Sequence, residues 1–139
     1  MLRSIVWLLL LVMCPIAAQA DDSLTARNKA LVRDFYTTVL IKRDVDAAAR
    51  FLWPDYIQHN PNVPTGLTGF TDTFRARFAK PLPPDYRREL LNVVAENDLV
   101  VIYVAQTWTG HDGIHHRALG FDMFRVREGK IAEHWDADD

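Results

Sequence analysis

The residues with the clearest potential for chemistry lie in the last twenty positions, GFDMFRVREGKIAEHWDADD. Asp122 interrupts a segment that otherwise has the composition of a buried strand, and His134 and Asp136 stand at the end of the next strand. Burying a carboxylate is costly unless it is paired or hydrogen-bonded. A pair of Asp122 and His134 could therefore act as a general base, with the histidine orienting the carboxylate or relaying its proton.

A structural role for Asp122 fits the same residues. Arg117 or Arg125 could form a salt bridge with this carboxylate, or backbone amides could hold it without any chemistry. Buried carboxylates occur in structural networks as well as in active sites, so both interpretations stay open.

Side-chain alternation along the strands predicts how these residues are presented. Asp122 shares a strand face with Phe124, and we expect helices to cover this face. The result would be an apolar wall with isolated polar groups, as in a small-molecule pocket. The preceding strand presents a similar set on one face: Ile102, Val104, Gln106 and Trp108. In the last strand, residues 131, 133 and 135 alternate with 132, 134 and 136, and the period leaves both orientations open.

Other histidines need separate consideration. His59 precedes a turn and, with Tyr56, could line the mouth of a pocket or only cap a loop. A polar segment contains a further group that could be considered for metal binding: His111, Asp112, His115 and His116. Their spacing matches no established ligand pattern, so we predict no metal site here.

The N-terminus has the pattern of a secretory signal peptide. Arg3 precedes an apolar run, and Ala18-Gln19-Ala20 provides a small-residue cleavage site, so we predict a leader over residues 1–20. The protein would then be periplasmic or secreted, with a single domain over residues 21–139. Removal of the leader also removes Cys14, the only cysteine, and leaves Ser23 as the only serine, which argues against nucleophilic catalysis.

Charge excludes two classes of partner. The mature chain would carry 15 basic and 18 acidic residues, a net charge of −3, and its basic residues are dispersed along the sequence. This distribution does not favour nucleic acid, or a membrane after leader cleavage, as a partner.

The pattern of elements predicts an α+β domain. Apolar periodicity indicates helices over residues 23–44, with Ser23 as N-cap, over 44–53, ended by Pro54, and over 67–80. Strands are expected over four later segments: 86–96, 99–110, 118–128 and 130–136. Asn97-Asp98 and Glu128-Gly129 are expected to form the tight turns between them.

Two segments, DVDAAARFLWPDYIQHNPNVPTGLTGF and FDMFRVREGKIAEHWD, resemble the SnoaL-like proteins of the nuclear transport factor 2-like superfamily. More narrowly, they are similar to a bacterial group predicted to catalyse aldol-type condensations. The resemblance implies a cone-shaped, curved antiparallel sheet wrapped around three N-terminal helices. It also implies cofactor-free acid–base catalysis, with Asp122 as the base. His134 and His59, in the EHWD and QHNP motifs, would be the polarising or orienting groups.

Together, these observations predict an enzyme that abstracts a proton next to the carbonyl group of a small, mostly apolar compound, leading to aldol closure or isomerisation. The expected substrate-binding residues are Tyr56, Gln106, Trp108, Phe124, Trp135 and Asp136. The alternative is a non-catalytic protein that binds a small molecule in the same pocket. A homodimer is also possible, and its exposed strand faces would carry a contiguous apolar patch.

Overall fold

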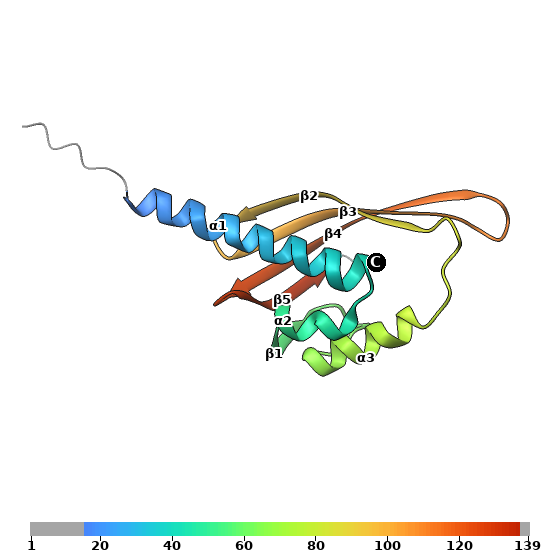
Figure 1. Ribbon diagram of the computed structural model, residues 1–139, viewed down its shortest axis with the longest axis horizontal. Helices are drawn as coiled ribbons and strands as arrows, with labels where there is room; N and C mark the ends of the chain where they lie inside the picture. The colour runs from blue at the N-terminus through green and yellow to red at the C-terminus, as the bar shows by residue number, and fades with distance from the viewer. Residues whose placement is uncertain (1–15, 137–139) are drawn as a thin grey trace, which may run out of the picture.

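The computed structural model of the protein describes residues 16–136 and has the predicted α+β plan (Figure 1). The helical elements, in chain order, are α1 (Ile16–Phe35), a π-helical continuation η1 (Tyr36–Ile41), a short 3-10 turn η2 (Val45–Ala47), α2 (Ala48–Phe51) and α3 (Leu67–Phe78). No helix within the described range is both long and apolar enough to cross a membrane. Residues 1–15, most of the predicted leader, lie outside the described residues.

Five strands form one open, curved sheet in the order β1-β5-β4-β3-β2. They are β1 (Leu52–Gln58), β2 (Arg87–Glu96), β3 (Leu99–Thr109), β4 (His115–Arg127) and β5 (Lys130–Asp136). All neighbours are antiparallel except β1, which pairs parallel with β5 at the edge. The expected cone-like fold is therefore confirmed, with β1 as a parallel addition to the four predicted strands.

Two predicted boundaries of the helices are wrong. Ser23 lies inside α1 and not at its N-cap, because the helix already begins at Ile16. The second helix ends at Phe51, and Pro54 lies within β1. A proline is tolerated there because β1 is an edge strand, where a missing N–H does not interrupt a ladder on both sides.

The two predicted hairpin turns are confirmed. Asn97 adopts φ 54°, and Glu128 and Gly129 adopt φ 49° and 76°. Positive φ at both positions of the second turn matches the right-handed twist of the flanking strands. The hairpin after β3 is shorter than expected, because β4 begins at His115 within the segment predicted to be a polar loop.

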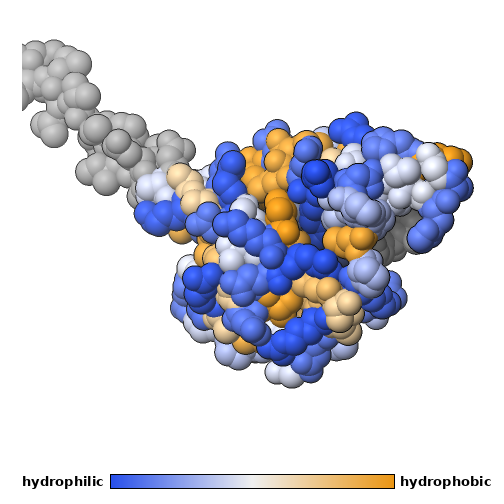
Figure 2. All heavy atoms as spheres, turned by 45° about the vertical axis from the view of Figure 1, so that its right-hand side comes forward, coloured by the Kyte–Doolittle hydropathy of each residue, from blue (hydrophilic) through white to orange (hydrophobic). Residues whose placement is uncertain are grey.

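The core lies between the helices and the concave face of the sheet. Phe35 of α1 packs edge-on against Phe124 of β4, with ring centroids 5.8 Å apart, and also contacts Phe70 of α3. Phe124 is buried, whereas Phe121 on the opposite face of β4 is 60% exposed. The predicted inner face of β4 is thus confirmed. Figure 2 shows mainly hydrophilic residues over one side of the molecule, with hydrophobic ones visible towards its centre and top.

A β-bulge decides which side chains of β5 point inward. Arg125 pairs with Glu133, but the next residue of β4, Val126, pairs with Ile131, so Ala132 is an extra residue in the ladder. Because a one-residue insertion changes the phase of a strand, both Ile131 and His134 face the interior. Without the bulge, an inward Ile131 would place His134 outside.

Candidate active site

A cavity of about 280 Å³ opens on the concave face of the sheet. Its walls come from α1 and η1, β1 and the loop after it, α3, and β2 to β5, and at β4 they include the consecutive residues 119–122. Six of the nine predicted site residues line it: Tyr56, Gln106, Asp122, Phe124, His134 and Asp136. These residues come from four different strands, so the site exists only once the sheet has formed.

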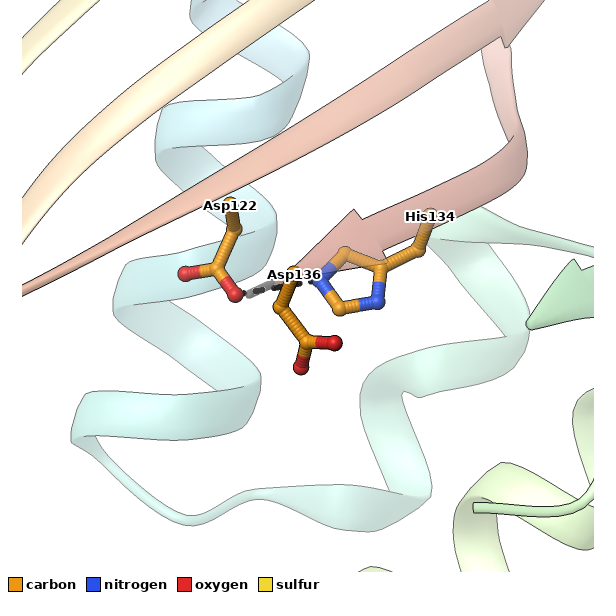
Figure 3. Close-up of side chains that lie close together, drawn as sticks. All are labelled: Asp122, His134 and Asp136. Atoms are coloured by element: carbon orange, nitrogen blue, oxygen red, sulfur yellow. Dashed lines mark hydrogen bonds and ion pairs between the residues drawn. The ribbon is translucent and has the colours of Figure 1, made fainter. Parts of the chain in front are cut away.

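Asp122 and His134 meet inside this cavity. In the ladder of β4 and β5, Phe124 is opposite His134 and Asp122 is opposite Asp136, so Asp122 lies diagonally across from the histidine. The Oδ1 atom of Asp122 is 3.1 Å from His134 Nε2 (Figure 3). The two side chains are 20% and 10% exposed, respectively, so the pair is largely shielded from bulk water. The predicted contact between them is present.

Gln58 determines how the imidazole of His134 is protonated. Its Oε1 atom lies 2.8 Å from His134 Nδ1 and also accepts a hydrogen bond of 3.0 Å from the backbone N–H of Asn60. A backbone N–H can only donate, so the atom facing it must be the amide oxygen of Gln58. His134 must then donate from Nδ1, which makes Nδ1 the protonated nitrogen.

This geometry places one shared proton between His134 and Asp122. With Nδ1 protonated, a neutral imidazole would present the lone pair of Nε2 to the carboxylate, and two acceptors would face each other. The 3.1 Å contact therefore requires a proton on Nε2 or on Asp122 Oδ1. The pair is either an imidazolium with a carboxylate or an imidazole with a carboxylic acid.

The structural alternative for Asp122 finds no support in the arginines. Arg125 contacts Asp98 at 2.6 Å and Glu133 at 3.0 Å, both away from Asp122. Within residues 16–136, neither Arg125 nor Arg117 pairs with Asp122, whose carboxylate has one hydrogen bond, to His134. Its second oxygen, Oδ2, has no hydrogen-bond partner in this part of the chain.

Asp136 supplies a second carboxylate beside the pair. Asn60 Nδ2 donates a 2.9 Å hydrogen bond to Asp136 Oδ2, while Oδ1 is buried and lacks a partner among the described residues. Ligand atoms of Asp122, His134 and Asp136 lie within 4.8 Å of one another, so these three could hold a small cation. A cation bound there through the histidine would replace its bond to Asp122, because Nδ1 is already bound to Gln58.

Two tyrosines add neutral hydroxyl groups to the cavity. Burial raises the pKa of both Tyr36 and Tyr56 far above the ordinary value of 10.0, so both hydroxyls stay protonated. Tyr56 accepts a hydrogen bond of 3.0 Å from Gln58 Nε2. The hydroxyl of Tyr36 has no hydrogen-bond partner within residues 16–136. Sequence reasoning missed Tyr36, although its position four residues after the buried Val32 marks the inner face of the helix.

Three predicted site residues do not reach the cavity. His59 stacks flat on Trp135, with ring centroids 4.6 Å apart, and its Nε2 lies 3.1 Å from Glu133 Oε2. These residues lie on the outer side of β5 because the bulge turns 133 and 135 outward. Trp108 lies outside the cavity for another reason: it is near the β3–β4 hairpin, beyond the cavity, where it stacks on His116. The structure therefore places His59, Trp108 and Trp135 outside the lining of this cavity.

The histidines of the polar segment do not assemble into a group of potential metal ligands. His116 Nε2 is 3.9 Å from Asp112 Oδ1, and His115 Nδ1 is 4.0 Å from Asp85 Oδ2, at separate exposed positions. The described residues contain one set of three potential ligands, and it is the cavity set above.

Comparison with known proteins links this geometry to a family. A sequence profile described as the SnoaL-like domain matches residues 32–134. Among the curated proteins, none matches the chain. The profile includes all strands except the last two residues of β5, and it contains both Asp122 and His134.

Solved structures share the fold over most of the chain. TsrD from Streptomyces laurentii is 25% identical, with 81% of this chain and 87% of that chain covered and a TM-score of 0.65. A putative polyketide cyclase from Acidithiobacillus ferrooxidans is 18% identical, with 80% and 87% covered and a TM-score of 0.65. An LEH-like epoxide hydrolase from M. tuberculosis is 16% identical, with 81% and 82% covered and a TM-score of 0.61. The last two likenesses concern the fold.

Proposed function

Because the chain belongs to the SnoaL-like domain family, within the nuclear transport factor 2-like superfamily, we propose that it is a cofactor-independent acid–base enzyme. Its substrate is a small organic compound with a carbonyl group, and the reaction begins by removal of a proton from the adjacent carbon. Aldol closure or isomerisation then follows from the enolate. The observation that carries this proposal is the Oδ2 oxygen of Asp122, which has no partner among the described residues and lies in a cavity where Oδ1 is held by His134.

The first step can be written for the residues present. Asp122 Oδ2 accepts the proton from the substrate carbon, and the electron pair of that C–H bond forms an enolate, whose negative charge lies on the former carbonyl oxygen. His134, protonated at Nδ1 by its bond to Gln58, shares its Nε2 proton with Asp122 Oδ1 and holds the carboxylate in place. Asp122 later returns its proton to carbon or oxygen, so the enzyme is regenerated.

Two further groups stabilise the substrate in this proposal. The hydroxyl of Tyr36 is neutral and has no partner in the described part of the chain, so it donates a hydrogen bond to the developing enolate oxygen. The buried Oδ1 of Asp136 accepts a hydrogen bond from a hydroxyl or enol of the substrate, which would satisfy an otherwise unpaired oxygen.

The deciding experiment follows deuterium exchange into the methyl group of 2-acetonaphthone in D₂O by proton NMR. The wild-type protein should accelerate exchange above the buffer rate, and Asp122→Asn should lower that acceleration by about 10²–10⁴-fold. Glu133→Gln, which alters the carboxylate of the outer His59 pair, is the matched control and should keep the wild-type rate.

Three results would contradict the proposal. Full activity of Asp122→Asn would mean that another group is the base. Loss of exchange in EDTA would mean that the chemistry needs a metal, for which the cavity set of ligands would be the place. Saturable binding of the ketone without exchange would favour the alternative function, a non-catalytic protein that binds small molecules.

We further propose that residues 1–20 are removed on export, so that the protein acts in the periplasm or outside the cell. The support is the leader pattern, which ends at Ala20. N-terminal sequencing of protein recovered from the periplasm or the medium of the expressing bacterium should begin at Asp21. An intact N-terminus on cytoplasmic protein would contradict export.

A homodimer is the third part of the proposal. The outer face of the sheet carries a contiguous apolar patch, the outer-face patch: Val94, Val101, Tyr103, Leu119, Phe121 and Met123. Tyr103 and Phe121 are cross-strand partners that stack at 4.7 Å, and Phe121 is 60% exposed. Such a surface favours association with a second copy. Sedimentation equilibrium should show a dimer for the wild-type protein and a monomer for Phe121→Glu. The control Ile114→Glu, in the hairpin turn, should remain a dimer. A monomeric wild-type protein would contradict the proposed dimer.

A further inference from the structure

A second cavity adjoins the one that contains Asp122. Its volume is about 460 Å³, and it lies between the ends of η1 and α3 and the segment that leads into β2. The two cavities share five lining residues: Leu40, Phe74, Arg77, Arg88 and Gln106. The two cavities therefore adjoin along these shared side chains.

Four arginines line this second cavity, which we call the arginine groove: Arg43, Arg77, Arg87 and Arg88. They come from three parts of the chain that only the fold brings together. Arg43 follows η1, Arg77 lies near the end of α3, and the other two begin β2. No Asp or Glu lines the groove.

The hydrogen-bond partners of these arginines are all neutral. Arg43 donates to the carbonyl of Phe78 at 2.8 Å, and Arg87 donates to the carbonyl of Tyr86 at 3.0 Å. Arg88 donates from Nε to the Tyr86 hydroxyl and from Nη2 to Gln106 Oε1, each at 3.2 Å. These contacts orient the guanidinium groups and leave several of their N–H donors free.

The gathering of several arginines without an ion pair around one cavity distinguishes this group, since other described arginines, such as Arg117, also lack an ion pair but line neither cavity. Arg75, Arg125 and Arg127 each contact a carboxylate, at 2.6, 2.6 and 3.2 Å. Within residues 16–136, none of the four groove arginines has a carboxylate within ion-pair distance. Placing four like charges around one cavity is unfavourable unless an anion offsets their repulsion.

We propose that the arginine groove binds an oxyanion, a carboxylate or a phosphate ester, at the far end of the substrate. This inference rests on the proposed function and deepens it, because it assigns the class of substrate: a carbonyl compound with an anionic tail. The tail binds among the arginines while the carbonyl end reaches Asp122. The charge difference between the two cavities orients the substrate, since an oxyanion beside Asp122 and Asp136 would be repelled.

Arg88 is the central residue of this proposal. It is half-buried, lines both cavities, and is held on one edge by Tyr86 and Gln106. The Tyr86 hydroxyl in turn donates to Gln106 Oε1 at 2.5 Å. Nη1 of Arg88 has no hydrogen-bond partner within residues 16–136, so it is available to the ligand. Two of the arginines also have a packing role: Arg43 stacks over Phe78 and Arg77 over Phe74. Arg87 and Arg88 are therefore the residues to vary.

The test compares two probes with the same aromatic ketone, measured by quenching of tryptophan fluorescence. 2-Acetonaphthone is neutral, and 6-acetyl-2-naphthoate adds one carboxylate. The wild-type protein should bind the naphthoate on the order of tenfold more tightly, and added NaCl should reduce this preference without affecting the neutral ketone. Arg88→Gln should abolish most of the preference, and Arg87→Gln, at an exposed position that the fold tolerates, should reduce it.

Arg117→Gln is the matched control, because Arg117 is exposed on β4 and lines neither cavity. It should keep the full preference. Equal binding of the two probes by the wild-type protein would overturn the proposal, and so would a full preference in both Arg87→Gln and Arg88→Gln.

Competition identifies the type of anion. Benzoate and phenyl phosphate are titrated against bound naphthoate. The stronger competitor indicates whether the anionic tail of the substrate is a carboxylate or a phosphate ester. If neither competes, the proposal that the arginine groove is an anion site is overturned. Catalysis is measured separately, by deuterium exchange into 2-acetonaphthone. If the protein exchanges 2-acetonaphthone but does not prefer the naphthoate, the proposed function stands and the anion site is overturned. If it prefers the naphthoate but does not catalyse exchange, the anion site stands and the proposed function is overturned.

Discussion

Two histidine–carboxylate pairs lie on opposite sides of β5, and their contact distances are the same. His134 is 3.1 Å from Asp122 on the inner side, and His59 is 3.1 Å from Glu133 on the outer side. The inner histidine side chain is 10% exposed, whereas the outer one is 40% exposed. Distance therefore does not distinguish the pair in the cavity from the pair at the surface.

The surroundings of the carboxylates make the difference. Glu133 is also bound by Arg125 at 3.0 Å, so both of its oxygens have partners. Asp122, in the cavity, has one oxygen without a hydrogen-bond partner among the described residues, and Gln58 determines the protonation of its histidine. A carboxylate with an unused oxygen, an oriented partner and access for a substrate can act as a base, and the outer pair lacks the first of these.

The largest expected difference between the two sides is in stability. Phe124 packs against His134 and Phe35 in the core, so Phe124→Ala should lower the free energy of unfolding by about 3–5 kcal/mol. Trp135 stacks on His59 at the surface, and Trp135→Ala should cost about 1 kcal/mol. Urea denaturation monitored by circular dichroism measures both variants. Similar losses would mean that the two sides of β5 are equally packed.

Replacing each histidine in turn tests whether the two pairs contribute differently to the rate of deuterium exchange. His134→Gln removes the group that orients Asp122 and shares its proton, so deuterium exchange into 2-acetonaphthone should slow about a hundredfold. His59→Gln removes a partner of Glu133 outside the cavity and should leave the exchange rate unchanged. A large rate loss in His59→Gln would show that the outer pair contributes to catalysis.

Substitutions of Gln58 test whether its hydrogen bond to His134 matters for the exchange reaction or only for packing. Gln58→Met leaves the Nδ1–H of His134 without an acceptor, which should cost about 1–3 kcal/mol of stability and change the pH dependence of exchange. Gln58→Glu keeps an acceptor oxygen at this position and should restore much of the rate. An unchanged pH profile in Gln58→Met would contradict the assignment of the protonated nitrogen.

The smallest expected effect concerns a third pair, His115 and Asp85, which are 4.0 Å apart at the surface. Hydrogen bonds from the hydroxyl and backbone N–H of Thr109 lower the pKa of Asp85 below its ordinary value of 3.8. A lowered pKa in the folded state stabilises the fold above the ordinary value, and the gain is lost as pH falls through the folded value. Asp85→Asn should therefore lower the Tm slightly at pH 7, and the difference from wild type should shrink below about pH 3.8. A constant difference would contradict this linkage.

The sequence predicted much of this architecture for identifiable reasons. Alternation along the strands placed Asp122 and Phe124 on the inner face, and phenylalanines four residues apart predicted α3. The turn residues predicted both hairpins, since Asn97 in the first turn and Gly129 in the second belong to the residue types that adopt positive φ most readily. These features depend on residue types and their local spacing, so they can be predicted before any tertiary contact is known.

The tertiary structure alone decided which histidine is in the cavity. The period of β5 left both faces open, and the bulge at Ala132 depends on how β4 pairs with β5, which is a long-range interaction. The protonation of His134 likewise depends on Gln58, which is distant in sequence and reaches β5 through a parallel pairing that β1 makes only in the folded sheet. The arginine groove combines residues 43, 77, 87 and 88 in the same way. Residue types and local periods determined the catalytic candidates, and strand register determined which of them meet, because a shift of one residue exchanges the two faces of a strand.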